Sequence, residues 1–144
     1  MGGKQEKLST EELMRMLETS NTLDNVIYNN QSITNPDTSS YLSDLLIKHN
    51  MTIQQVLEKA VISRSFGYQI FNGLRNPNRD ILLRIAIVMK LNVDEVQRLL
   101  KISQRGELYP KIRRDAAIIF CIKNKCDLTD TVELLESIGE SSLF

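Results

Sequence analysis

The sequence predicts an all-α protein. Of its 144 residues, 42% are apolar, which is enough to build a packed core. Glycine (6 residues) and proline (3 residues) are sparse, so the connections between elements should be short. Apolar residues recur at helical spacing, and residues that favour helix N-termini stand before several of these runs. These features favour helices throughout the chain.

The first 40 residues read as an acidic N-terminal arm. Ser9 and Glu12 form a capping box that opens a short helix ending at about Glu18. A second apolar patch, LDNVIYNN, follows, and residues 30–40 have the polar, aperiodic composition of a linker. The compact part of the protein is therefore expected to begin near Tyr41.

Residues 41–102 contain signals for five helices joined by short turns. The first helix ends at Asn50, a residue that accepts positive φ, and Gly73 ends the third for the same reason. Pro77 prevents an immediate restart of the helix. Residues suited to cap the second to fifth helices precede their apolar runs: Thr52 (with Gln55), Ser63, Asn78 and Asn92 (with Glu95).

Residues 103–144 are predicted to add a two-helix extension. Pro110 suits the first turn of a sixth helix, and Thr129 can cap a seventh that Gly139 closes. The sixth helix has an apolar stripe of Ile112, Ala116, Ile119 and Phe120, and the seventh has one of Val132, Leu134, Leu135 and Ile138. These stripes either pack onto the five-helix core or form a homodimer interface within residues 110–138.

The charge is balanced overall but unevenly distributed. The chain has 18 basic and 18 acidic residues. Residues 1–40 carry 3 basic and 6 acidic residues, for a net charge of −3. Residues 41–102 carry 9 and 5, for +4, and residues 103–144 carry 6 and 7, for −1. The positive charge therefore gathers in the middle of the chain.

The chain lacks the residue patterns of common catalytic and metal sites. Its only histidine is His49, and Cys121 and Cys126 stand five apart on one expected helix, which would place them on different faces. We therefore expect two buried thiols, no disulfide and no metal site. No nucleophile–His–acid set or Gly-rich phosphate loop is visible, so no enzymatic activity and no cofactor are expected.

The sequence also shows no signal for membrane insertion or export. No apolar run reaches the roughly 18 residues that a transmembrane helix needs. The first residues, MGGKQEKLST, lack the apolar stretch of a signal peptide. A cytoplasmic protein without a membrane partner is therefore expected.

Two short helices, 53–60 and 64–72, joined by a tight turn match a helix-turn-helix unit. The second helix of such a unit lies in the major groove of DNA. Positions 64, 65, 68 and 69 share one face of that helix because of their i, i+4 spacing, while Phe66 and Ile70 face the core. An arginine on this face can pair with guanine and a glutamine with adenine.

The stretch VLEKAVISRSFGYQIFNGLRNPNRDILLRIAIVMKLNVDEVQRLL resembles the Cro and lambda-repressor-like helix-turn-helix domains, often called Xre type. The resemblance covers residues 41–102 and rests on five helices of the right order and length, with Ser63 at the helix cap, then Gly73 and Pro77. It implies a DNA-binding domain whose base-reading residues are Arg64, Ser65, Tyr68 and Gln69. The resemblance also implies phosphate contacts at Thr52, Ser63, Arg75, Asn76 and Arg79.

Three positions depart from the family pattern. Val61 stands where the family prefers glycine in the turn, and Leu57 stands where it prefers a small alanine. Gly67 falls where the family buries an aliphatic side chain, a space that the neighbouring Phe66 is expected to fill. A β-branched residue at positive φ is strained, so a turn of different shape is expected at Val61.

Two functions are consistent with these features. The first is a sequence-specific DNA-binding transcriptional regulator, acting as a dimeric repressor that places helix 64–72 in the major groove. The alternative is a protein-interaction adaptor that keeps the helix-turn-helix scaffold without tight DNA binding. The zero net charge, the acidic arm and the departures at Val61 and Gly67 motivate this alternative.

Overall fold

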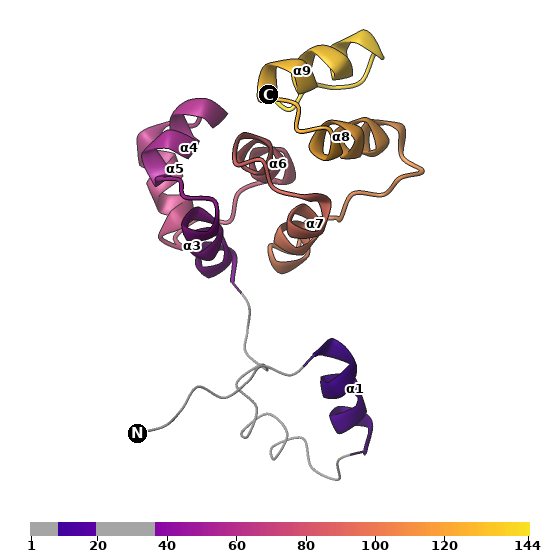
Figure 1. Ribbon diagram of the computed structural model, residues 1–144. Coiled ribbons are helices and arrows are strands. Elements are labelled where there is room, and N and C mark those ends of the chain that lie inside the picture. The colour runs from indigo at the N-terminus through magenta and orange to yellow at the C-terminus, as the bar shows by residue number, and fades with distance from the viewer. Residues whose placement is uncertain (1–8, 20–36) are drawn as a thin grey trace. The chain divides into compact units, whose positions relative to one another are not determined.

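The computed structural model describes residues 9–19 and 37–144, and the chain divides into two units, Met1–Asn35 and Pro36–Phe144. The described residues form eight helices and no strand, which confirms the all-α prediction (Figure 1). In the first unit, α1 (Thr10–Thr19) begins with the predicted capping box between Ser9 and Glu12. The predicted apolar patch 23–30 lies outside the described residues.

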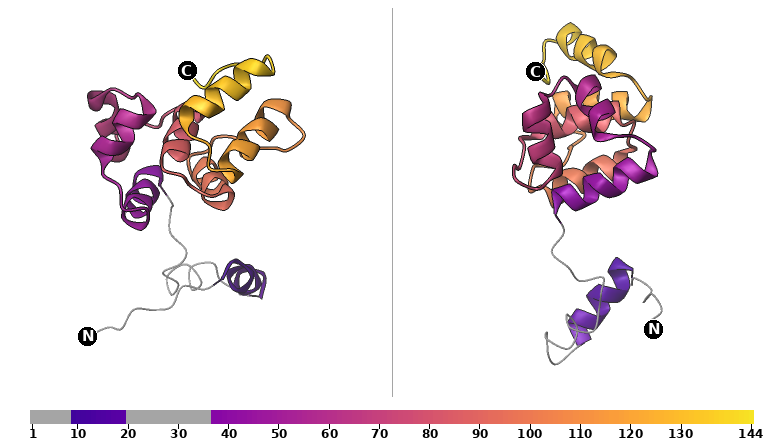
Figure 2. Two further views of the ribbon diagram at one scale, coloured as in Figure 1. Left: turned by 45° about the horizontal axis from the view of Figure 1, so that its top comes forward. Right: turned by 90° about the vertical axis from the view of Figure 1, so that its left-hand side faces the viewer.

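The second unit is built around one buried helix, α6. Helices α3–α5 lie on one side of α6, and α8 and α9 lie on the other (Figures 1 and 2). Six of the ten residues of α6 are buried, which makes it the centre of the core. The helices of this unit are α3 (Thr38–Lys48), α4 (Ile53–Ala60), α5 (Arg64–Phe71), α6 (Arg79–Val88), α7 (Val93–Ile102), α8 (Arg113–Lys123) and α9 (Leu128–Ser137).

The predicted caps of α4 to α7 are confirmed. The side chains of Thr52, Ser63, Asn78 and Asn92 each accept a hydrogen bond from the backbone N–H three residues further along the chain. Both predicted capping boxes, one beginning α4 and one beginning α7, are complete. These caps use backbone donors that the first turn of a helix leaves unpaired, so they fix where each helix starts.

Three predicted helix starts are wrong. Helix α3 begins at Thr38, three residues before Tyr41, because the Asp37 carboxylate accepts a hydrogen bond from the Ser40 N–H at 2.7 Å. Helix α8 begins at Arg113, so Pro110 lies in the turn before it. Helix α9 is capped by Asp127, which precedes the predicted Thr129. Asp37 and Asp127 thus cap α3 and α9, whereas Ile112, the residue before α8, makes no side-chain cap.

The placement of the two cysteines on different faces of one helix is also wrong. Helix α8 ends at Lys123, and Lys125 adopts positive φ (56°) beyond it. The chain therefore turns back, and Cys126 lies outside the helix with its N–H bonded to the Cys121 carbonyl at 3.0 Å. Cys121 is buried and Cys126 is half-buried, and neither forms a disulfide.

Helices α8 and α9 share the core of the preceding five helices. Ile118, Ile122 and Leu135 are buried in the same apolar cluster as the residues of α6. The second predicted stripe is therefore used within the fold: Leu135 is fully buried and Val132 packs against the core. On α8, by contrast, Ile112 and Phe120 remain more than half exposed (52% and 58%).

The turn between α4 and α5 keeps its left-handed shape despite Val61. Val61 has φ 57° and ψ 50°, the conformation that glycine adopts most easily, so the expected change of turn shape is wrong. The Leu57 side chain lies directly over Gly67, where a Cβ would overlap its methyl groups. Leu57 therefore fills the space above Gly67, a role expected of Phe66.

The length and apolar character of the described helices can be compared with what a membrane-spanning helix needs. Within residues 9–19 and 37–144, no helix has both the length and the apolar character to cross a bilayer.

Candidate nucleic-acid interface

Helix α5 is held on the second unit by one apolar face. Ile70 and Phe71 are buried and Phe66 is half-buried against the core, as predicted for Phe66 and Ile70. Gly67 lets α5 approach α4 closely because the Leu57 side chain occupies the space of the missing Cβ. The opposite face of α5 therefore points away from the core.

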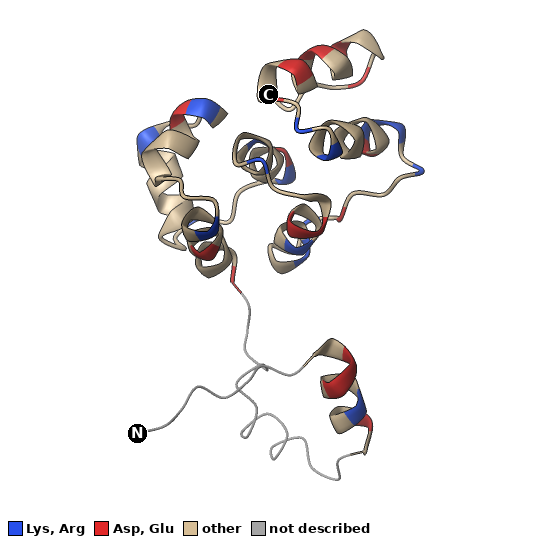
Figure 3. Ribbon diagram, viewed as in Figure 1, with Lys and Arg blue, Asp and Glu red and all other residues tan. Residues whose placement is uncertain are grey.

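Three of the predicted base-reading residues, Arg64, Ser65 and Gln69, lie on this outer face, whereas Tyr68 packs in part against the core. Arg64 and Ser65 are exposed, and Tyr68 and Gln69 are half-buried. The Arg64 guanidinium carbon lies 5.6 Å from the centroid of the Tyr68 ring, within the range of a cation–π interaction. Helix α5 carries no acidic residue, whereas α9 carries three and no Lys or Arg (Figure 3). The face therefore offers hydrogen-bond donors and a positive charge without a competing carboxylate on the same helix.

Gln69 is oriented by a residue from the loop that follows α5. The Arg75 Nε–H donates to Gln69 Oε1 at 3.1 Å. This bond distinguishes the two ends of the Gln69 amide, because the oxygen faces Arg75 and the NH₂ group is left for another acceptor. Arg75 is exposed, and within the described residues this is the one hydrogen bond that its side chain makes. Sequence reasoning placed both residues at the interface but missed the contact between them.

The loop from Asn72 to Asn78 is fixed to the end of α7. Gly73 adopts φ 79°, which turns the chain away from α5. The Asn76 side chain donates to the Ser103 carbonyl at 3.3 Å. Arg105 donates to the Pro77 carbonyl at 2.9 Å and to the Asn76 carbonyl at 3.1 Å. These bonds hold the backbone after Arg75 in place, and the Leu74 and Arg75 N–H groups donate to the Gln69 carbonyl, so Arg75 projects from a fixed support.

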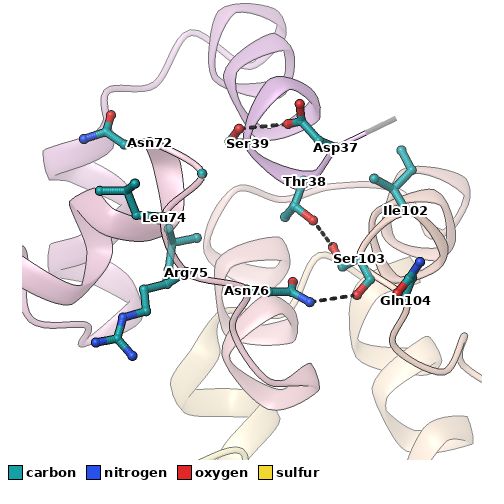
Figure 4. Close-up of a pocket in the computed structure, with 12 residues that line it drawn as sticks. Asp37, Thr38, Ser39, Asn72, Leu74, Arg75, Asn76, Ile102, Ser103 and Gln104 are labelled. Carbon is teal, nitrogen blue, oxygen red and sulfur yellow. Dashed lines mark hydrogen bonds between the residues drawn. The ribbon is translucent and has the colours of Figure 1, made fainter. Parts of the chain in front are cut away.

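A cavity of about 630 Å³ lies beside this loop, between the start of α3 and the end of α7 (Figure 4). Its wall is mainly polar, and several of its polar groups bond to one another. Thr38 and Ser103 are joined through their hydroxyl groups at 2.8 Å, and Ser39 donates to Asp37 at 2.8 Å. The Thr38–Ser103 bond joins the start of α3 to the end of α7, and the Asn76–Ser103 bond fastens the loop to the same end of α7.

Arg79, a predicted phosphate contact, is used inside the fold. Its guanidinium forms two 2.8 Å hydrogen bonds with the Asp115 carboxylate and also donates to the carbonyls of Gly106 and Glu107. This hydrogen bonding with Asp115 raises the pKa of Arg79, although burial opposes the shift. Because Arg79 already has four acceptors, we do not retain it among the phosphate contacts.

The other predicted phosphate contacts keep exposed groups. Thr52 and Ser63 are exposed and use their hydroxyl oxygens as acceptors in the caps of α4 and α5, so each hydroxyl proton remains available for donation. Thr52, Ser63 and Arg75 thus combine donors at the edges of the α5 face.

The side chains on α5 and in the loop that follows it supply hydrogen-bond donors, one aromatic ring and two arginines. Within residues 9–19 and 37–144, no group of three or more His, Cys, Asp or Glu side chains is arranged to hold a metal ion. No protein-family model, curated protein or solved structure matches this chain.

Proposed function

We propose that this chain is a sequence-specific DNA-binding transcriptional regulator. Helices α4 and α5 act as a helix-turn-helix unit of the Xre type, and α5 enters the major groove. The observation that carries the proposal is the outer face of α5, where Arg64 and Ser65 are exposed and Gln69 is half-buried beside the anchored Arg75; Tyr68, which packs in part against the core, lies under Arg64. Binding at a promoter would repress transcription by excluding the polymerase, with no reaction performed.

The side chains of α5 match the edges of particular bases. Arg64 can donate two hydrogen bonds to guanine, and Gln69 can bond to both N6 and N7 of adenine. Arg75 favours the second pairing because it fixes the orientation of the Gln69 amide before DNA arrives. The Tyr68 ring and the Ser65 hydroxyl supply further contacts on the same face.

Contacts to the DNA backbone come from the residues that frame α5. Thr52 and Ser63 lie at the starts of α4 and α5, and Arg75 and Asn76 lie in the loop after α5. Arg75 can bond a phosphate through its terminal NH₂ groups while its Nε–H holds Gln69. The Asn76 side chain already bonds Ser103, so its contribution is to hold the loop in register.

We also propose that two copies bind DNA together. Ile112, the residue before α8, lies in line with Ala116 and Phe120 of that helix; Ile112 and Phe120 are exposed and Ala116 is half-buried. A two-fold axis at Ala116 would place Ile112 of one copy against Phe120 of the other, and the small alanine would let the helices approach. Such a dimer would carry two copies of α5 and would double the number of phosphate contacts.

The test is selection of bound sequences from a pool of random DNA duplexes, with the full chain at two salt concentrations. We expect one preferred sequence that contains guanine and adenine at defined positions. Arg64→Ala and Gln69→Ala should each weaken binding to it by about 1–3 kcal/mol, roughly 5- to 150-fold, and relax the preference at one base pair. Arg75→Ala should weaken binding and also flatten its dependence on salt by about one phosphate contact.

Lys123→Ala is the matched control, because Lys123 is an exposed cation on α8, on the other side of α6 from α5 (Figure 1). It should leave the preferred sequence unchanged, and because Lys123 borders only the proposed α8 contact, its loss should not weaken binding. Failure to enrich any sequence at low salt would contradict the proposal. Equal losses in Lys123→Ala and Arg64→Ala would show that charge alone governs binding.

One observation favours a second function, that of a protein-interaction adaptor on the same scaffold. Arg79 is turned into the fold, which leaves Arg64 and Arg75 as the cations on and beside the outer face of α5. Two cations per copy give a weaker attraction to DNA than the six to ten phosphate contacts of strong binders. The selection experiment separates the two functions, since an adaptor would enrich no sequence.

A further inference from the structure

The two cysteines meet at a specific type of helix end. Beyond α8, Asn124 caps the helix and Lys125 adopts the left-handed conformation (φ 56°). The Lys125 N–H donates to the Ile122 carbonyl at 3.2 Å, and the Cys126 N–H donates to the Cys121 carbonyl at 3.0 Å. These two bonds define a Schellman motif, in which Cys121 is the third residue from the helix end and Cys126 is the second residue beyond the cap.

A Schellman motif brings the side chains at these two positions into contact. Most helix ends place apolar side chains there, and this chain places two thiols. Burial raises the pKa of the Cys121 thiol, and the nearby Cys126 thiol raises it further, although hydrogen bonding to Thr131 opposes the shift. The two sulfur atoms are thus neighbours although their residues stand five apart in the sequence.

The two thiols differ in their access to solvent. Cys121 is 1% exposed and lies under α9, whereas Cys126 is half-buried in the turn between α8 and α9. A reagent from solution therefore reaches Cys126 first. Disulfides often form in two steps, in which an accessible thiol first forms a mixed disulfide and a neighbouring thiol then displaces the small molecule. The exposures of Cys126 and Cys121 suit these two roles.

We propose that Cys121 and Cys126 are a redox modification site that closes reversibly to a disulfide by exchange with a low-molecular-weight disulfide such as oxidised glutathione. The Cys126 thiolate attacks one sulfur of glutathione disulfide, and its S–S bond breaks to release one glutathione. The Cys121 thiolate then attacks Cys126 Sγ, and the second glutathione leaves. Two protein thiols are oxidised by two electrons, and one glutathione disulfide becomes two glutathione thiols that take up the two protons.

The bridge would tie the end of α8 to the start of α9. Asp127, the residue after Cys126, caps α9, and Leu128 begins that helix with a buried side chain. Since the Schellman motif already holds the two residues together, closure needs no rearrangement of either helix. The folded state should therefore favour formation of the disulfide, and the disulfide should stabilise the folded state by the same free energy, because the two equilibria are linked.

The test uses the full chain equilibrated in mixtures of oxidised and reduced glutathione, alkylated to trap free thiols, and analysed by mass spectrometry after digestion. We expect a peptide pair joined through Cys121 and Cys126 that disappears on reduction. The bridge should form at an oxidised-to-reduced ratio at least about tenfold lower in the folded chain than in the chain unfolded in urea. The bridged protein should also melt at a higher temperature than the reduced protein.

Two variants make each step visible. Cys121→Ser should stop at a glutathione adduct on Cys126, and Cys126→Ser should show little reaction because Cys121 is buried. A bridge that forms no more readily in the folded chain than in urea would overturn the proposal. So would glutathione adducts on the unaltered chain that never close, or cross-links between two chains instead of within one.

Discussion

Two residues at the contact between α4 and α5 have exchanged the roles that the family pattern assigns. The resemblance to Xre-type domains predicts a small residue at 57 and an aliphatic side chain at 67. The chain has Leu57 and Gly67, and the leucine side chain fills the volume from the other helix. The total volume is conserved, so the core stays packed although both positions depart from the pattern.

The exchange predicts that Gly67→Ala destabilises the protein when residue 57 is leucine and stabilises it when residue 57 is alanine. Gly67→Ala should destabilise the protein by about 1–3 kcal/mol, because the added Cβ overlaps the Leu57 methyl groups in a packed core. In a Leu57→Ala background the same Gly67→Ala change should stabilise by about 0.5–1 kcal/mol, since the clash is gone and alanine favours the helix. Urea unfolding of the four proteins measures both effects. Equal effects in the two backgrounds would show that the residues do not interact.

Val61 illustrates strain that the fold tolerates in a turn. Its φ of 57° is unfavourable for a β-branched residue, and its side chain is 67% exposed, so little packing compensates. Val61→Gly should therefore stabilise the protein by about 0.5–1 kcal/mol, after allowance for the greater freedom of glycine in the unfolded chain. Thermal and urea unfolding check this, with Val61→Thr as a control that keeps the β-branch. A destabilised glycine variant would contradict the argument.

At the scale of elements, the chain shows which features a sequence can predict. The caps at Thr52, Ser63, Asn78 and Asn92 were predicted because a cap depends on one side chain and the backbone three residues away. The start of α8 was not, because contacts remote from Pro110 decide it. Asp115 accepts a hydrogen bond from the Tyr109 N–H and pairs with Arg79, which holds the chain in a turn until Arg113.

In the candidate interface, too, features that depend on nearby residues were predicted, and features that depend on residues far along the chain were missed. The outward face of α5 follows from i, i+4 spacing within one helix; Arg64 and Ser65 are exposed and Gln69 is half-buried there, while Tyr68 also packs against the core. The inward turn of Arg79 depends on Asp115, which lies 36 residues further along the chain. The loop anchor Arg105 likewise acts on Asn76 and Pro77 from a distance that no local pattern reveals.

The contact between α3 and α7 makes stability depend on pH. Glu95 at the start of α7 is buried, and burial alone raises the pKa of its carboxyl group. Hydrogen bonds from the Asn92 N–H, His49 and Lys48 outweigh that effect and lower the pKa from 4.5 to about 2. The ionised carboxylate therefore stabilises the fold fully above about pH 4.5, and this contribution is lost as the pH falls toward 2.

Glu95→Gln tests this contribution. At pH 7 the variant should be less stable by up to about 3 kcal/mol, and the difference should shrink steadily between pH 4.5 and pH 2, because protonation removes the same charge from the unaltered protein. Urea unfolding across this range measures it, with Asp94→Asn, an exposed neighbour on α7, as the control. A difference that stays constant with pH would indicate lost packing in place of lost charge.

At the scale of the whole molecule, the proposed dimer and the proposed DNA complex respond to salt in opposite directions. The apolar line on α8 is bordered by Lys111, Arg113 and Lys123, which are exposed. In a symmetric pair these cations face their copies, so their repulsion opposes association and added salt screens it. Binding to DNA loses affinity as salt rises, because the counterions that binding releases gain less entropy in a solution that already holds more salt.

Sedimentation of the full chain over a range of concentrations checks the dimer. We expect a weak monomer–dimer equilibrium that strengthens when salt is raised from about 0.05 to 0.5 M, where the Debye length falls below the spacing of the cations. Phe120→Ser should raise the dissociation constant at least about tenfold, through the loss of roughly 1.4 kcal/mol or more of apolar contact. Ile47→Ser, which removes an exposed apolar side chain from α3, should have no effect. A chain that stays monomeric at every concentration would contradict the proposed dimer contact through α8. Single copies would then bind DNA.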